Sequence, residues 1–309
     1  MNMSPASIRR SILPALAGLG VWGALWSPTV AARDTTSTPD PGREEPFVVR
    51  AFHPFIGSKW IGNAVAYGPH RDGQRPGGES PAREELREDL RILAAHWNLF
   101  RLYSASDGVA ETTLQIIEED GLDLRVMLGV WVAVEERLNE SGLVEVFPEA
   151  RAANRREVEA AIRLAKAYPE LVPAVCVGNE TQVFWSDHRT PLHVLTRYVR
   201  EVRARVGAPV TVADDFNFWN KPESRPLAGE LDFLVMHYHP LWNGVLLPDA
   251  LSETRRIQAE IQAHHPERTV VVGETGWAWK GGAHPDEVEK HWGLFRADRT
   301  PKTALSEDE

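Results

Sequence analysis

Cysteine is nearly absent from the 309-residue chain, which has only Cys176. No internal disulfide can form, so the small disulfide-stapled scaffolds of secreted proteins are excluded and the protein must be held together by its core. Cys176 lies inside the apolar stretch LVPAVCVG, where a cysteine packs as a small apolar side chain. We therefore predict a core role for it rather than a catalytic one.

Basic residues are also in deficit. The chain has 34 lysines and arginines against 44 aspartates and glutamates, which gives a net charge of −10. A surface that binds nucleic acid or an anionic membrane needs the opposite balance. The composition is compatible with a neutral substrate, and no nucleic-acid partner is expected.

Two common cofactor motifs are missing. The glycines of residues 67–78 have no helix directly behind them, so they do not form a phosphate-binding turn. No cluster of cysteines and histidines has the spacing of a metal site. His237 and His239 are expected to face opposite sides of one strand, which argues against a two-histidine site there. We predict neither a metal nor a cofactor.

Residues 1–32 have the pattern of a secretory signal. Basic residues stand at Arg9 and Arg10, an apolar run covers residues 12–26, and small residues end at Ala32, where we expect the cleavage. This predicts an exported protein, periplasmic or secreted. An uncleaved membrane anchor is the alternative, but the run is short for a span, so no stable membrane insertion is expected after cleavage. The arginine pair is a weak match to a twin-arginine signal.

The rest of the chain divides into a linker and a folded part. Residues 33–48 are polar and proline-rich, which is typical of a flexible linker. Residues 49–309 remain for the folded domain. With 43% hydrophobic residues in the chain, they can form one domain of barrel size or two smaller ones.

Short apolar runs alternate with amphipathic helical patterns along the folded part. The seven runs cover residues 60–68, 98–104, 124–132, 172–180, 209–215, 231–239 and 269–277. Helical patterns cover residues 81–96, 109–119, 155–167, 191–206 and 251–264, with Asn154 placed as the N-cap of the third. Repeated strand and helix units of this kind predict a parallel sheet covered by helices.

The fold class that fits best is an α/β protein of the (β/α)8 TIM-barrel type. A doubly wound open sheet would give the same alternation, but it normally carries the glycine-rich turn that is missing here. Polar and aromatic side chains, such as Tyr103, gather where the runs end. Active sites of (β/α)8 barrels are built at the carboxyl ends of the strands.

Two glutamates end apolar runs directly behind glycine-containing turns: Glu180 in VGNE and Glu274 in VGET. On the fourth and seventh strands of a barrel they would lie across the mouth from each other. Glycoside hydrolysis needs two such carboxyl groups, one on each side of the scissile bond. The alternative is that each glutamate caps a helix or pairs with a nearby arginine.

Several motifs resemble glycoside hydrolase family 17, the β-1,3-glucanase family, in its bacterial branch. They are VGNE, VVVGETGW, RLYS, VMLGVW, YGPHRDGQRPGG and HWGLFRADRTPK, and together they span about residues 60–302. The resemblance implies a (β/α)8 barrel and a retaining mechanism. It also implies that Glu180 is the general acid/base, that Glu274 is the nucleophile, and that Asn179 bonds the sugar 2-hydroxyl.

Aromatic side chains near the strand ends are expected to bind sugar, because pyranose rings pack their apolar faces on indole. Tyr103 and Tyr238 could supply hydroxyl groups to the reactive sugar or to the nucleophile. Lys280 belongs to a tryptophan-lysine pair that resembles the one after the family's eighth strand. The tryptophan platforms considered are Trp185, Trp219, Trp242, Trp277 and Trp279, each of which could instead be a packing residue.

The sequence departs from the family pattern after Glu274. Only Ala278 separates GETGW from the tryptophan-lysine pair, so helix seven and strand eight of the family are missing. We expect a barrel that is incomplete or distorted at the eighth strand. The alternatives are a closing strand formed by residues 277–280 or 292–295, and an internal deletion in the gene.

The leading functional hypothesis is an exported endo-1,3-β-glucanase-like hydrolase that acts on β-glucan with retention. A β-1,3-glucan transglycosylase is the first alternative, because the two reactions share their first step. A catalytically impaired glucan-binding protein on a truncated barrel is an alternative of another class. An α/β domain that binds some other small ligand at its strand ends is the third.

Overall fold

The structure is a computed structural model that describes residues 47–139 and 141–276. The predicted signal, most of the predicted linker, Trp277, Trp279, Lys280 and residues 292–295 lie outside the described residues. In the described part, every helix is too short or too polar to cross a lipid bilayer.

A seven-stranded sheet forms the centre of the fold, and its strands are all parallel. Their order in the sheet is their order in the chain. The strands are β3 (Ala64–Ala66), β4 (Leu99–Arg101), β5 (Arg125–Val130), β8 (Ala174–Asn179), β9 (Val210–Asp215), β10 (Leu234–His237) and β11 (Val270–Glu274). The two outer strands, β3 and β11, approach to within 8 Å between Cα atoms. The sheet is therefore a nearly closed seven-stranded barrel, which confirms the predicted incomplete (β/α)8 architecture.

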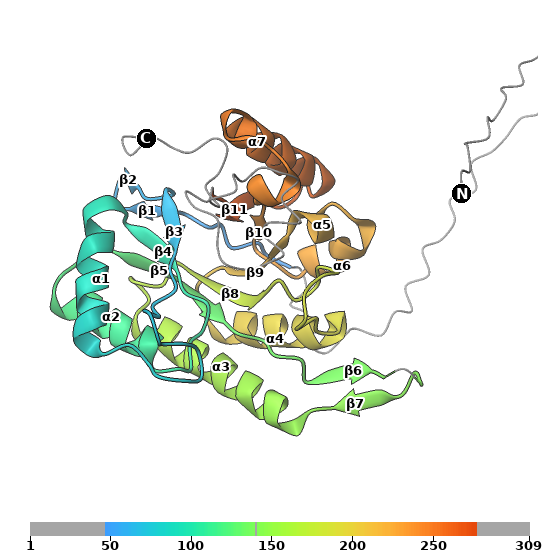
Figure 1. The fold of residues 1–309 in the computed structure, drawn as a ribbon, viewed down its shortest axis with the longest axis horizontal. Coiled ribbons are helices and arrows are strands. Elements are labelled where there is room, and N and C mark those ends of the chain that lie inside the picture. The colour runs from blue at the N-terminus through green and yellow to red at the C-terminus, as the bar shows by residue number, and fades with distance from the viewer. Residues whose placement is uncertain (1–46, 140, 277–309) are drawn as a thin grey trace, which may run out of the picture. The chain divides into compact units, whose positions relative to one another are not determined.

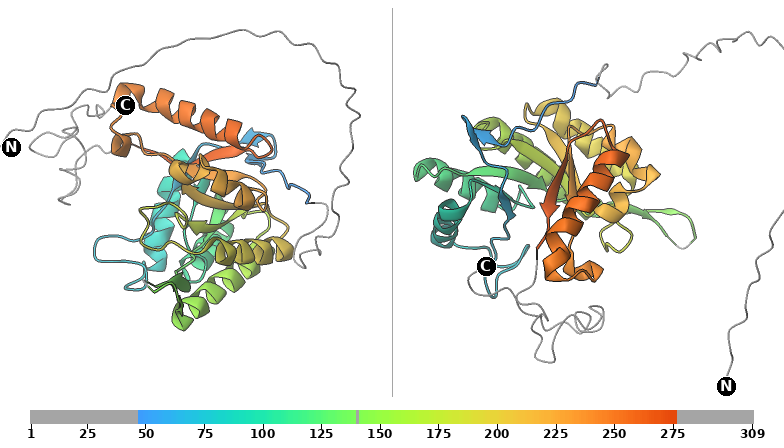
Figure 2. Two further views of the ribbon diagram at one scale, coloured as in Figure 1. Left: turned by 90° about the vertical axis from the view of Figure 1, so that its right-hand side faces the viewer. Right: turned by 90° about the horizontal axis from the view of Figure 1, so that it is seen from above.

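Helices cover the outside of the curled sheet (Figures 1 and 2). The long ones are α1 (Arg83–His96), α2 (Val109–Glu119), α3 (Pro148–Ala167), α4 (Leu192–Arg205) and α7 (Leu247–His264). Short turns follow β9 and β10: α5 (Phe216–Trp219), η1 (Pro222–Ser224), α6 (Arg225–Ala228) and η2 (Leu241–Asn243). Two small antiparallel hairpins join β1 (Phe55–Ile56) to β2 (Lys59–Trp60), and β6 (Glu136–Leu138) to β7 (Val144–Val146).

The third long helix begins earlier than predicted, and Asn154 is not its N-cap. Helix α3 starts at Pro148, and proline suits the first helical position because that residue needs no backbone donor. Asn154 is buried within the helix. Its amide group donates to the carbonyl of Ala133 and to Glu135 Oε2, so the polar side chain serves a tertiary contact instead.

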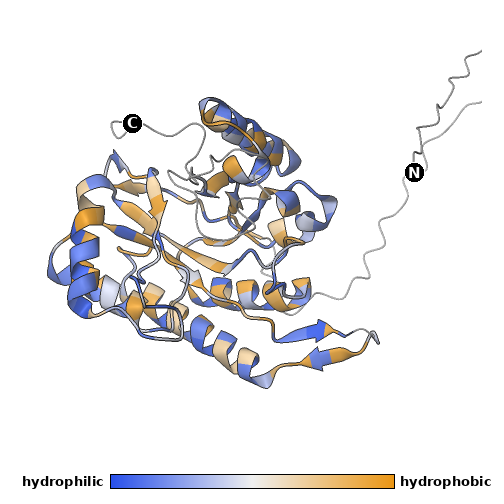
Figure 3. Ribbon diagram, in the orientation of Figure 1, coloured by the Kyte–Doolittle hydropathy of each residue, from blue (hydrophilic) through white to orange (hydrophobic). Residues whose placement is uncertain are grey.

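The core has two layers, one on each face of the sheet. A small cluster that includes Met127, Cys176 and Val235 fills the barrel, and Phe52 stacks on Phe233 with ring centroids 4.6 Å apart. A larger cluster fills the space between sheet and helices, and the sheet strands are accordingly apolar while the outer helix faces are polar (Figure 3). The core role of Cys176 is confirmed, since it is 3% exposed within this cluster, and its burial raises the pKa of its thiol to about 11.

A seam remains between β3 and β11, where an eighth strand would pair in a complete barrel. Within the described ranges, no strand occupies it. A cavity of about 730 Å³ runs along the seam, lined among others by Trp60, Trp97 and Gln258. The lining also includes Arg101 and Gly273, so the open edge lies next to the strand end that carries Glu274.

Candidate active site

Glu180 owes its position to a backbone irregularity at the end of β8. The pairing of β8 with β9 shifts register between Cys176 and Asn179. Gly178 has φ +84°, and Glu180 itself has φ +50°, in the left-handed region that non-glycine residues rarely adopt. A Cβ atom at Gly178 would lie 3.0 Å from the side chain of Leu195. The glycine of VGNE is therefore required for the turn that carries Glu180.

Gly273 has the corresponding function on β11. The pairing of β10 with β11 shifts register there, so that Met236 pairs with Val272 but His237 pairs with Glu274. A Cβ atom at Gly273 would lie 2.1 Å from Cγ1 of Val235, so no residue with a side chain fits at this position. Both glycines mark bulges, and bulges next to active sites re-aim the side chains that follow them.

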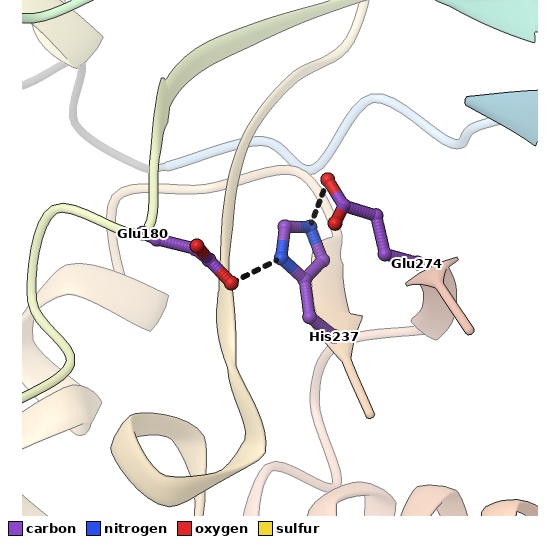
Figure 4. A group of neighbouring side chains, drawn as sticks. All are labelled: Glu180, His237 and Glu274. Atoms are coloured by element: carbon purple, nitrogen blue, oxygen red, sulfur yellow. Dashed lines mark hydrogen bonds and ion pairs between the residues drawn. The ribbon is translucent and has the colours of Figure 1, made fainter. Parts of the chain in front are cut away.

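The two glutamates meet at the carboxyl ends of their strands. One carboxylate oxygen of Glu180 lies within 4.8 Å of one of Glu274. Both side chains are 18% exposed, so they are accessible but mostly surrounded by protein. Figure 4 shows the carboxylates on the two sides of the His237 ring, which comes from the end of β10.

Arg101 holds the Glu274 carboxylate in place. Its side chain is 6% exposed, and its Nη2 donates to Glu274 Oε1 at 2.5 Å and to Asn179 Oδ1 at 2.6 Å. Tyr103 donates from its hydroxyl to the same Glu274 oxygen at 2.8 Å. The sequence motifs did not identify Arg101 as a site residue. The signal was a charged residue inside the apolar run NLFRLYS, because arginine is seldom buried without a partner.

The Glu274 carboxyl is strongly acidic in this setting. Burial opposes its ionisation, but the contact from His239, the charge that His237 carries when protonated and the Arg101 guanidinium together lower its pKa to about 2. The hydrogen bond from Tyr103 acts in the same direction. Glu274 is therefore ionised at any pH near neutrality, as a nucleophile must be.

The expectation that His237 and His239 face opposite sides was wrong. Residues two positions apart in extended chain share a face. His237 Nε2 lies 3.6 Å from Glu274 Oε1, and His239 Nε2 lies 3.5 Å from Glu274 Oε2. Both rings therefore approach one carboxylate, and both histidines belong to the site.

His237 joins the two glutamates through a fixed tautomer. Its side chain is fully buried, with Nε2 2.9 Å from Nη1 of Arg101 and Nδ1 3.1 Å from Glu180 Oε1. Arginine can only donate hydrogen bonds, so Nε2 of the neutral ring accepts. The ring proton then lies on Nδ1 and is donated to Glu180 Oε1.

Glu180, His237 and Glu274 are also the residues that could approach a metal ion, since one ligand atom of each lies within 4.8 Å of the others. The positive Arg101 guanidinium already donates to Glu274 and contacts His237. Its charge disfavours a cation at this position. The arrangement suits proton transfer and nucleophilic attack better than metal binding.

Asp214 fixes the loop behind Glu180. It is fully buried and accepts hydrogen bonds from the backbone N–H groups of Gln182, Val183 and Asp215. Burial raises the pKa of its carboxyl to about 7, against the lowering effect of those donors. Asp214 thus holds the segment that follows Glu180 at the end of the neighbouring strand.

The predicted substrate-binding residues differ from one another in where they lie and how exposed they are. Tyr103 and Asn179 lie at the site, through their contacts with Glu274 and Arg101. Trp185, in the loop after β8, and Trp242, in the short helix η2 after β10, are about half exposed.

The structure contradicts the prediction that Trp219 and Tyr238 bind substrate, because both side chains are buried and neither can reach a substrate. Trp219 is 0% exposed, and its indole N–H donates to the carbonyl of Val235 in the layer between sheet and helices. Tyr238 is 2% exposed and packs edge-on against Phe216. It follows His237 directly and so faces the helices instead of the barrel mouth.

A family model of the BtgE/BtgC glycoside hydrolase domain matches residues 64–292, which is most of the chain. The chain belongs to this family. The resemblance to glycoside hydrolase family 17 is thereby confirmed, and solved structures of that family share the fold of this BtgE/BtgC-type domain.

Two curated relatives are glucan-active proteins of fungi. The chain is 26% identical over 221 residues to a glucan 1,3-beta-glucosidase from Arthroderma benhamiae, covering 68% of this chain and 64% of that protein. It is 22% identical over 212 residues to a glucan endo-1,3-beta-glucosidase from Emericella nidulans, covering 65% of this chain and 30% of that protein. The BtgE/BtgC-type domain thus spans less than two thirds of the length of either relative.

Two solved structures resemble the fold. An endo-laminarinase from Formosa matches with a TM-score of 0.59 and 20% identity, covering 72% of this chain and 67% of that one. A glycoside hydrolase family 17 β-1,3-glucanosyltransferase from Rhizomucor miehei matches with a TM-score of 0.55 and 23% identity, covering 74% and 77%. At these identities the likeness is one of fold.

The substitution Arg101→Met tests the electrostatic environment of Glu274. Losing the guanidinium should raise the pKa of the Glu274 carboxyl by about 1–3 pH units, because an adjacent opposite charge has an effect of this size. The measurement is a carbon NMR titration of protein labelled at the glutamate carboxyl carbons, with Glu274→Gln to identify the signal. Tyr103→Phe, which removes only a neutral donor, is the control and should raise the pKa less. An unchanged titration in Arg101→Met would contradict this account.

Proposed function

We propose that the protein is a retaining glycoside hydrolase that acts on β-1,3-glucan. The observation that carries the proposal is the separation of the Glu180 and Glu274 carboxylates, which have oxygens within 4.8 Å of each other. Retaining enzymes place their carboxyl groups roughly 5–5.5 Å apart, whereas inverting enzymes need more space for a water molecule.

In the first step, Glu274 attacks the anomeric carbon while Glu180 protonates the departing glycosidic oxygen. The bond to the leaving sugar breaks as the ester bond to Glu274 forms. The low pKa of Glu274 keeps it ionised for attack. Because Glu180 Oε1 accepts from His237, Oε2 is the oxygen that would carry the transferred proton.

In the second step, Glu180 takes a proton from an incoming hydroxyl group, whose oxygen attacks the anomeric carbon and releases Glu274. Two displacements on opposite faces of the sugar restore the original configuration. Asn179 uses its carbonyl oxygen for Arg101. Its amide N–H group is the part that would donate to the sugar 2-hydroxyl.

The substrate class rests on the relatives and on the site together. Both fungal relatives are named for action on glucan 1,3-β-linkages. The net charge of −10 fits a neutral polysaccharide. We propose that the domain cleaves internal linkages of the glucan, as an endo-acting enzyme does.

The substitution Glu274→Ala should lower turnover of laminarin by a factor on the order of 10⁴ or more, as loss of a nucleophile does in other enzymes, while laminarin binding is kept. With an activated aryl β-glycoside, added azide should restore turnover and give the α-glycosyl azide, because azide enters from the vacated face. Glu180→Ala is the matched control, since azide should then give the β-azide by attack on the glycosyl ester. A wild-type protein that binds β-1,3-glucan and never cleaves it would instead favour the impaired glucan-binding protein.

Transfer to a sugar acceptor is a second candidate activity. It is favoured by the fold similarity to a β-1,3-glucanosyltransferase, and it differs from hydrolysis only in the incoming hydroxyl group. Incubation with laminarihexaose followed by mass spectrometry separates the two. Hydrolysis should give only shorter products, which we expect, whereas products longer than six units would show transfer.

We also infer that the protein is exported, with residues 1–32 as a cleaved signal, residues 33–48 as a linker and residues 49–309 as the catalytic domain. The basic, apolar and small-residue order of the first segment supports this. Expression in a bacterial host should yield periplasmic or secreted protein whose amino-terminal residue is Arg33. Full-length protein retained in the cytoplasm would contradict the inference.

A further inference from the structure

His188 lies in the loop that joins β8 to α4 and that begins with Glu180. Its side chain is 23% exposed, and its Nε2 lies 2.8 Å from the carbonyl oxygen of Asn179. A carbonyl oxygen can only accept a hydrogen bond, so Nε2 carries the ring proton and donates it. The loop therefore folds back and bonds the residue directly before Glu180.

This contact fixes one end of the peptide group that joins Asn179 to Glu180. The other end is the N–H of Glu180, which donates to the carbonyl of Ala213 on β9 at 2.9 Å. A peptide group is planar, so hydrogen bonds at its two ends set its orientation. That orientation determines ψ of Asn179 and φ of Glu180.

The same peptide group is held in a conformation that the backbone disfavours. Glu180 has φ +50°, in the left-handed region. A rotation of the peptide group that returned Glu180 to a negative φ would also turn the Asn179 carbonyl away from His188. Local strain of this kind persists where the surrounding contacts determine it. The bond from His188 is therefore one of the contacts that keep Glu180 left-handed.

The His188 ring is itself held on a face and on an edge. Trp131, which directly follows β5, packs on the ring with 4.8 Å between centroids. The backbone N–H of Trp131 donates in turn to the buried carboxylate of Glu157 at 3.1 Å. On the ring edge, Nδ1 lies 3.2 Å from the Ser186 hydroxyl and 2.9 Å from Asp187 Oδ1. These contacts give the Nε2–H group a defined direction.

We propose that His188 is a positioning residue for the catalytic acid/base, because it holds the peptide group that aims the Glu180 carboxyl. The inference rests on the proposed function, in which Glu180 protonates the leaving group. Without His188, Glu180 would protonate a leaving group less efficiently. Glu274 and the Asn179 side chain would keep their bonds from Arg101. Loss of His188 should therefore weaken proton transfer and leave nucleophilic attack intact.

Two substrates separate these effects. Methoxyphenyl β-laminaribioside has a poor leaving group that needs protonation, whereas the leaving group of dinitrophenyl β-laminaribioside departs without it. For both, kcat/KM reports formation of the glycosyl ester. His188→Phe keeps a ring against Trp131 and removes the N–H. It should lower kcat/KM about 10–100-fold for the methoxyphenyl substrate and less than about twofold for the dinitrophenyl substrate, because only the first needs a well-placed acid.

His188→Gln is the matched variant, since its side-chain N–H can reach the same carbonyl, and it should restore most of the lost activity. His188→Ala, which lacks both ring and N–H, should show the same difference between the substrates as His188→Phe. His193→Phe is the control. His193 on α4 is 70% exposed, and its Nε2 lies 2.6 Å from Glu136 Oε1, so both kcat/KM values should stay unchanged.

Unchanged kcat/KM values for both substrates in His188→Phe and His188→Ala would overturn the inference and leave the proposed function intact. An equal loss on both substrates, with His188→Gln no better than His188→Phe, would also overturn it, because a general structural defect gives that pattern. A wild-type protein that cleaves neither aryl glycoside nor laminarin would overturn the proposed function together with this inference.

Discussion

Arg101 extends its guanidinium into the barrel mouth, where it meets partners from three other strands. It donates to Glu274 on β11 and to Asn179 on β8, and it contacts His237 on β10. A buried charge is costly unless it is paired and hydrogen-bonded, so the Arg101 guanidinium depends on these three partners. The pair of Arg101 and Glu274 also joins β4 to the edge strand β11. This contact bridges the barrel mouth near the seam, where no strand of the described part closes the ring.

The strand ends that carry the glutamates are irregular in the same way. Regular pairing would continue the alternation of side chains in and out of the barrel, and each bulge interrupts it once. The left-handed conformation of Glu180 adds local strain, which persists where the surroundings determine it. Here the surroundings are Asp214, which holds the following loop, and His237, which contacts the carboxylate.

Buried carboxylates outside the catalytic pair organise the loops around it. Asp214 fixes the loop after β8, and Glu157 fixes the ends of β4 and β5. Both accept several backbone N–H groups that would otherwise lack partners at the ends of short strands. The mouth of the barrel is therefore held by polar contacts, whereas the barrel interior and the helix layer are held by apolar packing.

The sequence by itself determined the alternation of strands and helices, the core position of Cys176 and the two glycine-linked glutamates. These follow from local patterns, because strand periodicity, glycine and charge act over a few residues. Only the tertiary structure decided which side chains surround the glutamates. Arg101 is 173 residues from Glu274 and 136 from His237, so no local pattern could pair them. The same reason separates Tyr103 from Trp219 and Tyr238: all three are aromatic residues near strand ends, but the tertiary packing places Tyr103 against Glu274 and buries the other two in the helix layer.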